Sequence, residues 1–346
     1  MVITIAITGS INYLVDPMWL FSHQFTFNQV QGAFNERQQK TNYLQFRNSN
    51  TYNGVLLGSS RTASINQKDF VGMNVFNYAF GSMKPFEYIE YLEFFKKKHK
   101  NLNYIIIGAD FLNTSIPNPK NINFEIPKYY INNTINPSYR LTTLLSVDTL
   151  RYSFINIARF LNRRDENKGA FYDRNNIRFK DKASEKQRIE AYTSNIKRQT
   201  NYFTGKNYKY NHEYISILNT LKNNNPHTNI IIFTSPISAD LLVSIIKNGE
   251  RLKEYRDWLY NLITEFGLIY HFMDINSITT NLKNYPDDSH YYPYIGKLVA
   301  NRISDFDNQK IPNDFGIVLN KNNLDEYLNK FEKKLNLYKN PLSIIR

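Results

Sequence analysis

The sequence predicts an α/β fold with a doubly wound, parallel sheet of five strands and a helical insertion. Short apolar runs alternate with amphipathic stretches, which is typical of strands joined by crossover helices. The chain has 346 residues, of which 42% are hydrophobic and 15% aromatic, enough for a sizeable buried core. The predicted strands are residues 53–57, 73–78, 104–108, 229–234 and 268–273.

The segments between these strands suit helices. Pro85 opens a predicted helix that runs to residue 98, because proline favours the first turn and apolar residues recur after it at helical spacing. The run at 104–108 is almost continuously apolar, the pattern of a strand buried on both faces. Further helices are predicted at residues 251–266, 294–306 and 324–337.

The alternation stops after Asp110 and resumes only at residue 229. We therefore predict an insertion at residues 111–225, with helical patterns at 141–161 and 184–199, placed over the carboxyl edge of the sheet. The predicted organisation is an apolar segment (1–22), a lead-in arm (23–51), an α/β domain (52–310) that contains the insertion, and a C-terminal helical tail (311–346).

The N-terminal segment carries no charge from Val2 to Val15 and is mostly apolar. Fourteen residues are too few to cross about 30 Å of hydrocarbon. We expect this segment to be the outer end of a membrane anchor that begins outside this chain, with Trp19 and Phe21 at the membrane interface. The alternative is a buried strand.

Composition excludes several kinds of site. The net charge is +13, but the basic residues are spread along the chain, so we predict no nucleic-acid binding. The chain has no cysteine, which excludes zinc thiolate sites, disulfides and thiol catalysis. The Asp and His residues show no metal-ligand spacing, and no glycine loop suits a phosphate, so neither a metal nor a cofactor is expected.

A serine nucleophile is predicted directly after the first strand, in Gly58-Ser59-Ser60-Arg61. A serine hydroxyl needs an imidazole to take its proton and a carboxylate to orient that imidazole. Asp287 precedes His290 by three residues, within reach of its ring. We therefore predict Ser60 as the nucleophile, His290 as the base and Asp287 as the orienting carboxylate.

These blocks, in their order, resemble the SGNH (GDSL-like) hydrolase superfamily over residues 52–306. The Gly-Ser-Ser block and the insertion are similar to its cell-envelope O-acyltransferase branch, the alginate O-acetylation and teichoic acid D-alanyl transfer proteins. The resemblance implies the roles given above for Ser60, His290 and Asp287. It also implies that the N–H of Gly81 joins the oxyanion hole.

One block departs from the family pattern, which has Gly-x-Asn where this chain has Gly108-Ala109-Asp110. A carboxylate repels a developing oxyanion unless it is protonated or paired. In a flavodoxin-like sheet the first and third strands end side by side, so we expect Arg61 to pair with Asp110. The backbone N–H groups of Ser60 and Gly81 would then be the oxyanion donors, with Asn77 and Asn113 as substitutes, and Asp110→Asn would raise turnover.

The resemblance implies a serine esterase or O-acyltransferase that acts on acyl groups of a cell-envelope polysaccharide. Such a protein would be extracytoplasmic and membrane-anchored, in the periplasm or on the outer face of the cytoplasmic membrane. Its partners would be an acylated or acceptor glycan and a membrane protein that supplies the acyl group. The alternatives are a non-catalytic glycan- or protein-binding member of the same fold and an anion-binding module.

Overall fold

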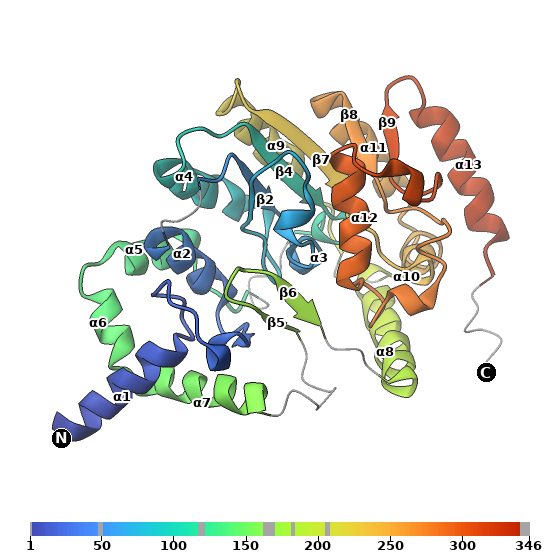
Figure 1. Cartoon of the computed structure of the whole chain (residues 1–346). Coiled ribbons are helices and arrows are strands. Elements are labelled where there is room, and N and C mark those ends of the chain that lie inside the picture. Colours follow the sequence, from blue (N-terminus) through green and yellow to red (C-terminus); the bar gives the residue numbers. More distant parts are fainter. Residues whose placement is uncertain are drawn as a thin grey trace.

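A computed structural model describes residues 2–47, 51–116, 122–161, 170–180, 184–204 and 208–339. Its centre is a six-stranded sheet with the order β3-β2-β4-β7-β8-β9 (Figure 1). The strands are β2 (Gly54–Leu57), β3 (Val75–Asn77), β4 (Tyr104–Ala109), β7 (Asn229–Thr234), β8 (Leu268–His271) and β9 (Ile317–Asn320). The predicted α/β class is confirmed.

The sheet is mixed, which corrects the prediction of five parallel strands. The five predicted strands pair in parallel, but β9 runs antiparallel to β8 as a sixth strand. No clear sequence pattern marks β9, since it is a four-residue edge strand whose Val318 is exposed.

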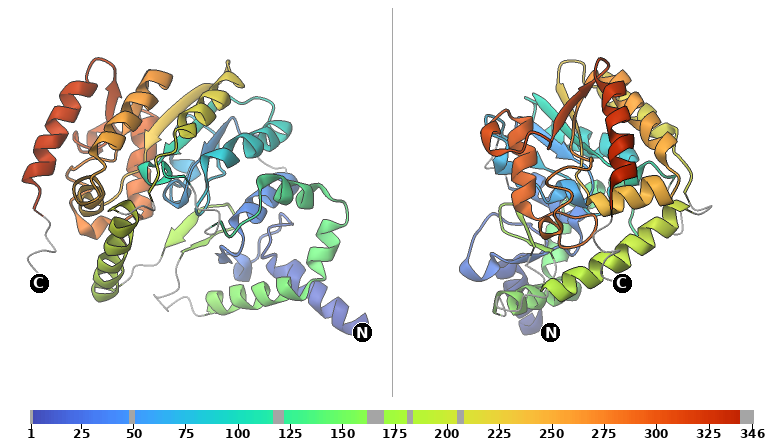
Figure 2. Two further views of the ribbon diagram at one scale, coloured as in Figure 1. Left: turned by 180° about the vertical axis from the view of Figure 1, so that it is seen from behind. Right: turned by 90° about the vertical axis from the view of Figure 1, so that its right-hand side faces the viewer.

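Successive residues of the central strands face two separate cores. In β2, Val55 and Leu57 belong to the core on one face, whereas Leu56 belongs to the core on the other. The first core is covered by α4 (Tyr88–Lys98), α9 (Glu213–Asn223), α11 (Leu252–Phe266) and α13 (Leu324–Leu337). The second is covered by α12 (Pro293–Ile303), so helices lie on both faces of the sheet (Figure 2).

The remaining elements are shorter or lie outside the main sheet. The other helices are α1 (Val2–Val15), α2 (Glu36–Phe46), α3 (Ser60–Ala63), α5 (Pro127–Ile135), α6 (Tyr139–Leu144), α7 (Val147–Leu161), α8 (Glu185–Thr204) and α10 (Ala239–Val243). The predicted helix at 141–161 is thus two helices, α6 and α7.

A small antiparallel sheet joins the lead-in arm to the insertion. Its strands are β1 (Gln31–Gly32), β5 (Ala170–Tyr172) and β6 (Arg178–Lys180), in that order. A buried ion cluster reinforces this junction, because Arg174 and Arg47 both contact the Asp16 carboxylate, with N–O distances of 2.6 and 3.4 Å. The arm and the first part of the insertion, from α5 to β6, therefore pack as one lobe beside the main sheet, whereas α8 and α9 lie outside this lobe (Figure 1).

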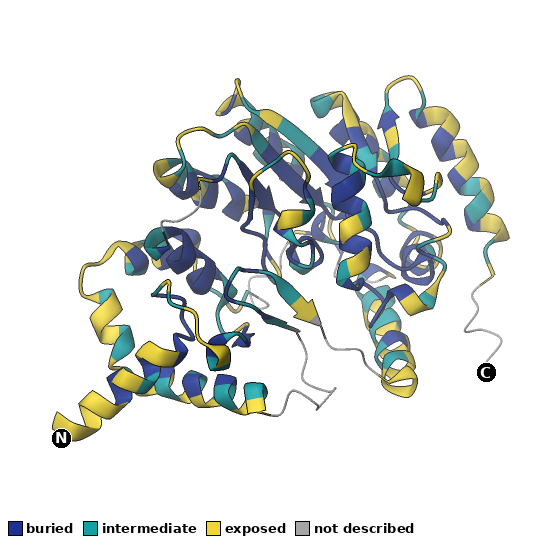
Figure 3. Cartoon of the chain, viewed as in Figure 1, coloured by how far each residue is buried: buried dark blue, intermediate teal, exposed yellow. Residues whose placement is uncertain are grey.

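The N-terminal segment forms the helix α1, so the alternative of a buried strand is wrong. One side of α1 packs on the insertion, where the Asn12 side chain donates to the carbonyls of Leu144 and Ser146 at 2.8 and 3.0 Å. Its first turns are exposed (Figure 3). Among the described residues, no helix combines the length and apolar character needed to cross a membrane.

Trp19 does not lie at an interface with solvent or lipid, which corrects the expectation from the sequence. Its side chain is 1% exposed and packs edge-on against Tyr43 and Tyr172. Tyr172 belongs to the insertion, so the Trp19 ring is buried by a residue that is distant in the sequence.

Two glycines allow α3 to lie close to the strands. A side chain at Gly58 or Gly108 would overlap the Thr62 side chain of α3, and Gly58 also has a φ of +150°. We predict that Gly108→Ala lowers the free energy of unfolding by about 1–3 kcal/mol, because the core is overpacked. Urea unfolding followed by circular dichroism measures this loss.

Thr62→Ala in the Gly108→Ala background should recover part of that loss, since the overlapping hydroxyl is removed. If Gly108→Ala is neutral, or if Thr62→Ala recovers nothing, this account of the close approach is wrong.

Candidate active site

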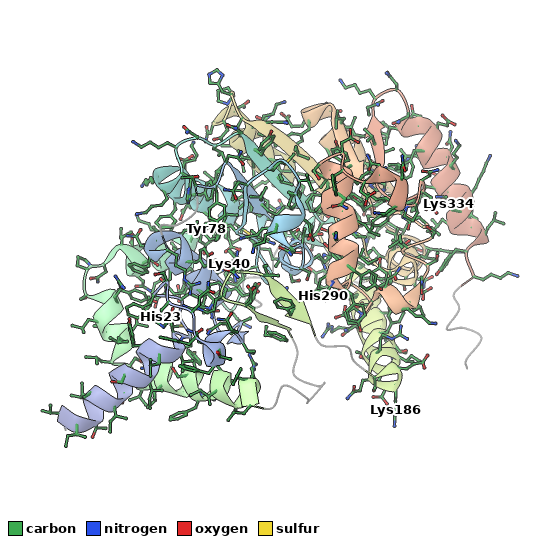
Figure 4. The ribbon with its side chains drawn as sticks, viewed as in Figure 1. His23, Lys40, Tyr78, Lys186, His290 and Lys334 are labelled. Carbon is green, nitrogen blue, oxygen red and sulfur yellow. The ribbon has the colours of Figure 1, made fainter. Side chains whose placement is uncertain are left out.

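Ser60 is the first residue of α3 and lies at the carboxyl end of β2. Its Oγ lies 2.8 Å from Nε2 of His290, which stands in the loop before α12. Figure 4 labels His290 near the beginning of this helix. Segments far apart in the sequence thus place a hydroxyl and an imidazole within hydrogen-bond distance.

The Asp287 carboxylate holds the other side of this imidazole. Both of its oxygens lie 3.0 Å from His290 Nδ1. Its Oδ1 also accepts the backbone N–H groups of Ser289 and His290, at 3.0 and 2.8 Å. Because the carboxylate is fixed by its own loop, it orients the ring with Nε2 toward Ser60. The structure therefore brings together the three residues that the sequence singled out.

The expected pair of Arg61 and Asp110 is present and buried. Arg61 Nε and Nη2 lie 3.0 and 3.1 Å from the two carboxylate oxygens, and Ser59 Oγ donates to Oδ2 at 2.5 Å. Burial opposes the charge of Arg61, but the Asp110 carboxylate outweighs it and raises the pKa of the guanidinium. Asp110 thus accepts hydrogen bonds beside Ser60 and has no donor to offer an oxyanion.

Two further side chains hold the backbone of α3. Arg178 Nη1 donates to the Ser60 carbonyl at 2.9 Å, and the Tyr291 hydroxyl donates to the Arg61 carbonyl at 2.8 Å. Tyr291 follows His290 directly, so the loop that carries the imidazole is tied to the helix that carries the serine. The sequence had no local signal for Arg178, which comes from strand β6 of the insertion.

The N–H of Gly81 is occupied, which corrects the expectation that it is a free oxyanion donor. It donates to Glu36 Oε2 at 2.7 Å, and the Tyr172 hydroxyl donates to the same carboxylate. Burial opposes ionisation of Glu36, but Arg178 and Lys40 lower its pKa, so the group is a carboxylate. Glu36 lies in the lead-in arm, and its distance along the chain hid this contact from sequence reasoning.

The substitute donors suggested by the sequence differ in their availability. The Asn77 amide donates to the carbonyls of Thr62 and Ile65 and is buried, so it supports the fold. Asn113 lines the cavity beside Ser60, but its Nδ2 already donates one hydrogen bond to the Met83 carbonyl at 3.2 Å. Ser82 also lines it, with a φ of +56°. Among the described residues, the N–H groups of Ser60 and Ser82 have no acceptor and are therefore available.

Ser60 and His290 open into a cavity of about 330 Å³. One wall comes from the α/β body and the other from α8 of the insertion, with Asn195, Arg198, Gln199 and Tyr202. Among the described residues, no group of three or more His, Asp or Glu side chains could hold a metal ion. The sequence did not indicate Lys84 or Arg198, because neither stands in a motif.

No protein-family model matches this chain, and searches of curated proteins and of solved structures found no match either.

Asp110→Asn should destabilise the protein, whatever its effect on turnover. Arg61 would lose its buried counter-charge, and breaking such a pair costs on the order of 3 kcal/mol. Urea unfolding would show a lower midpoint for Asp110→Asn than for the double variant Arg61→Met, Asp110→Leu, which leaves no charge unpaired. Equal stability of Asp110→Asn and the parent would contradict this role.

Asp288 predicts a specific pH dependence of stability. Its carboxylate is buried and has no hydrogen-bond partner among the described residues, and burial, followed by repulsion from Asp287, raises its pKa to about 7. The folded state therefore binds the Asp288 proton more tightly than the unfolded state does. Protonation of Asp288 thus stabilises the folded protein at low pH, and this contribution to the free energy of unfolding is lost as the pH rises toward and through 7.

In the parent protein we expect the free energy of unfolding to fall by on the order of 2 kcal/mol between about pH 5 and about pH 8 because of Asp288. Asp288→Asn should abolish this fall. Urea unfolding of both proteins at the two pH values measures the difference. An equal pH dependence in parent and variant would show that Asp288 titrates normally.

Proposed function

We propose that this protein is a serine esterase or O-acyltransferase in which Ser60 carries the acyl group. The observation that supports this most strongly is the series of contacts from Asp287 through His290 to Ser60 Oγ, which opens into a cavity. The order β3-β2-β4-β7-β8 supports a flavodoxin-like core, in which ligands bind at the carboxyl edge of the strands. Ser60 stands at that edge.

In the proposed reaction, Ser60 Oγ attacks the carbonyl carbon of an ester while His290 Nε2 takes the hydroxyl proton. The bond to the leaving alcohol then breaks, and His290 returns the proton to the alcohol oxygen, which leaves the acyl group on Ser60. Water or a sugar hydroxyl next attacks this acyl group and gives its proton to His290. The bond between the acyl group and Ser60 Oγ then breaks, and His290 returns the proton to Oγ, which restores the hydroxyl. Asp287 stabilises the imidazolium in both steps.

The oxyanion of this reaction needs at least two donors near Ser60. We assign the N–H of Ser60 and the N–H of Ser82, because both are unbonded and both residues border the cavity. Gly81 could contribute only after Glu36 has released its N–H.

The cavity suits an acceptor rich in hydroxyl groups. The amide side chains of Asn113, Asn195 and Gln199 and the hydroxyl of Tyr202 border it, and such groups exchange hydrogen bonds with sugars. We therefore propose a cell-envelope glycan as the acceptor or acylated substrate. An extracytoplasmic location and a membrane protein as acyl donor remain part of the proposal, supported by the exposed apolar residues of α1, such as Val2 and Ile3.

The second candidate is a non-catalytic glycan- or protein-binding protein on the same fold. One observation favours it, namely that the Glu36 carboxylate occupies the N–H of Gly81. A carboxylate in that place leaves fewer donors for an oxyanion than the resemblance implied.

A fluorophosphonate probe distinguishes the two candidates. We predict that the protein is labelled, that Ser60→Ala abolishes labelling, and that His290→Gln slows it by at least about 10³-fold, because the hydroxyl loses its base. Intact-mass spectrometry after timed incubation measures the label.

Ser64→Ala is the matched control. Its hydroxyl lies one turn further along the chain and donates to the Ser60 carbonyl at 3.1 Å, so labelling should persist. A folded parent protein that takes no label would favour the binding protein.

A further inference from the structure

The cavity beside Ser60 is bordered by three cationic side chains, Arg61, Lys84 and Arg198, and by no carboxylate of the residues that the structure describes. Arg61 is neutralised by its two-point contact with Asp110. Lys84 and Arg198 are different, because neither makes an ion pair among the described residues.

Lys84 comes from the α/β body, in the loop after β3. Its Nζ donates to the neutral Asn113 Oδ1 at 3.2 Å and has two further protons. The nearby Glu87 carboxylate is taken by Arg37, at 2.8 and 3.0 Å. Burial and repulsion from Arg61 lower the pKa of Lys84, as expected for an ammonium that is partly removed from water without a counter-ion.

Arg198 comes from the opposite wall, on α8, and is exposed. The carboxylate that acts on it is that of Asp288, which is buried, makes no hydrogen bond to it, and has a pKa raised to about 7. This carboxylate therefore compensates the guanidinium only in part. The insertion thus brings a partly compensated positive charge to the lining of the cavity.

We propose that Lys84 and Arg198 form a subsite for an anionic group, a carboxylate or a phosphate, carried by the substrate of Ser60. An ammonium and a guanidinium on facing walls offer several charge-assisted hydrogen bonds to such a group. Lys84 is partly buried, and a partly buried charge forms stronger bonds than one in open water. The inference rests on the proposed function for the reaction, but the binding that it describes does not.

The subsite makes the protein selective for anionic over neutral esters. A matched pair of substrates tests this, 3-acetoxybenzoate and its methyl ester, which differ by one negative charge. We expect the ratio of their kcat/KM values, anionic over neutral, to fall about tenfold in Arg198→Gln and in Lys84→Met, since one charge-assisted contact is lost.

Lys197→Gln is the matched control. It removes the same charge from the neighbouring position of α8, but Lys197 does not line the cavity, so the ratio should stay unchanged. If the ratio fell equally in all three variants, the selectivity would come from the overall charge of the protein, and the proposed subsite would be overturned.

Binding measured without turnover separates this inference from the proposed reaction. Isothermal titration of the Ser60→Ala protein with glucuronate, inorganic phosphate and glucose should show binding of at least one anion that is tighter than that of glucose and is lost with Arg198→Gln. Preference for glucuronate or for phosphate would identify the anionic group. Binding of neither anion above glucose overturns the subsite, even if Ser60 is labelled, whereas anion binding without labelling would retain the subsite and refute the esterase.

Discussion

The position of Ser60 depends on the buried ion pair between Arg61 and Asp110. Ser59 and Arg61 both bind the Asp110 carboxylate, so the residues on each side of Ser60 are tied to the end of β4. The Ser60 side chain is left to point toward His290. A buried pair is tolerated only when its geometry is good and its remaining lone pairs are bonded, and here three donors meet the one carboxylate. The departure from the Gly-x-Asn pattern thus has a structural role.

The lead-in arm and the insertion belong to the site as much as the sheet does. Arg178 of the insertion holds the Ser60 carbonyl, and Glu36 of the arm holds the N–H of Gly81. Lys40, which Figure 4 labels, follows Glu36 by four residues in α2. It donates to the carbonyls of Asn77 and Ala79, and burial lowers its pKa to about 7. A change in the packing of the arm would therefore disturb the surroundings of Ser60, because only a few hydrogen bonds lie between them.

Much of the α/β core could be predicted because its signals are local. The apolar run of β4 and the helix that follows Pro85 are visible within about ten residues, over which periodicity is informative. Strands β1, β5, β6 and β9 have two to four residues each and gave no such signal. The burial of Trp19 also could not be predicted, since its partner Tyr172 comes from the insertion.

The α/β class and the candidate residues Ser60, His290 and Asp287 could be read from the sequence, because a strand that ends at glycine and an Asp three residues before a His are local patterns. The groups that surround these residues became visible only in the folded chain. It engaged Gly81 with Glu36 and brought Lys84 and Arg198 to one cavity. The physical reason is that burial, charge compensation and hydrogen-bond occupancy depend on residues far apart in the chain, and no local pattern encodes their distances.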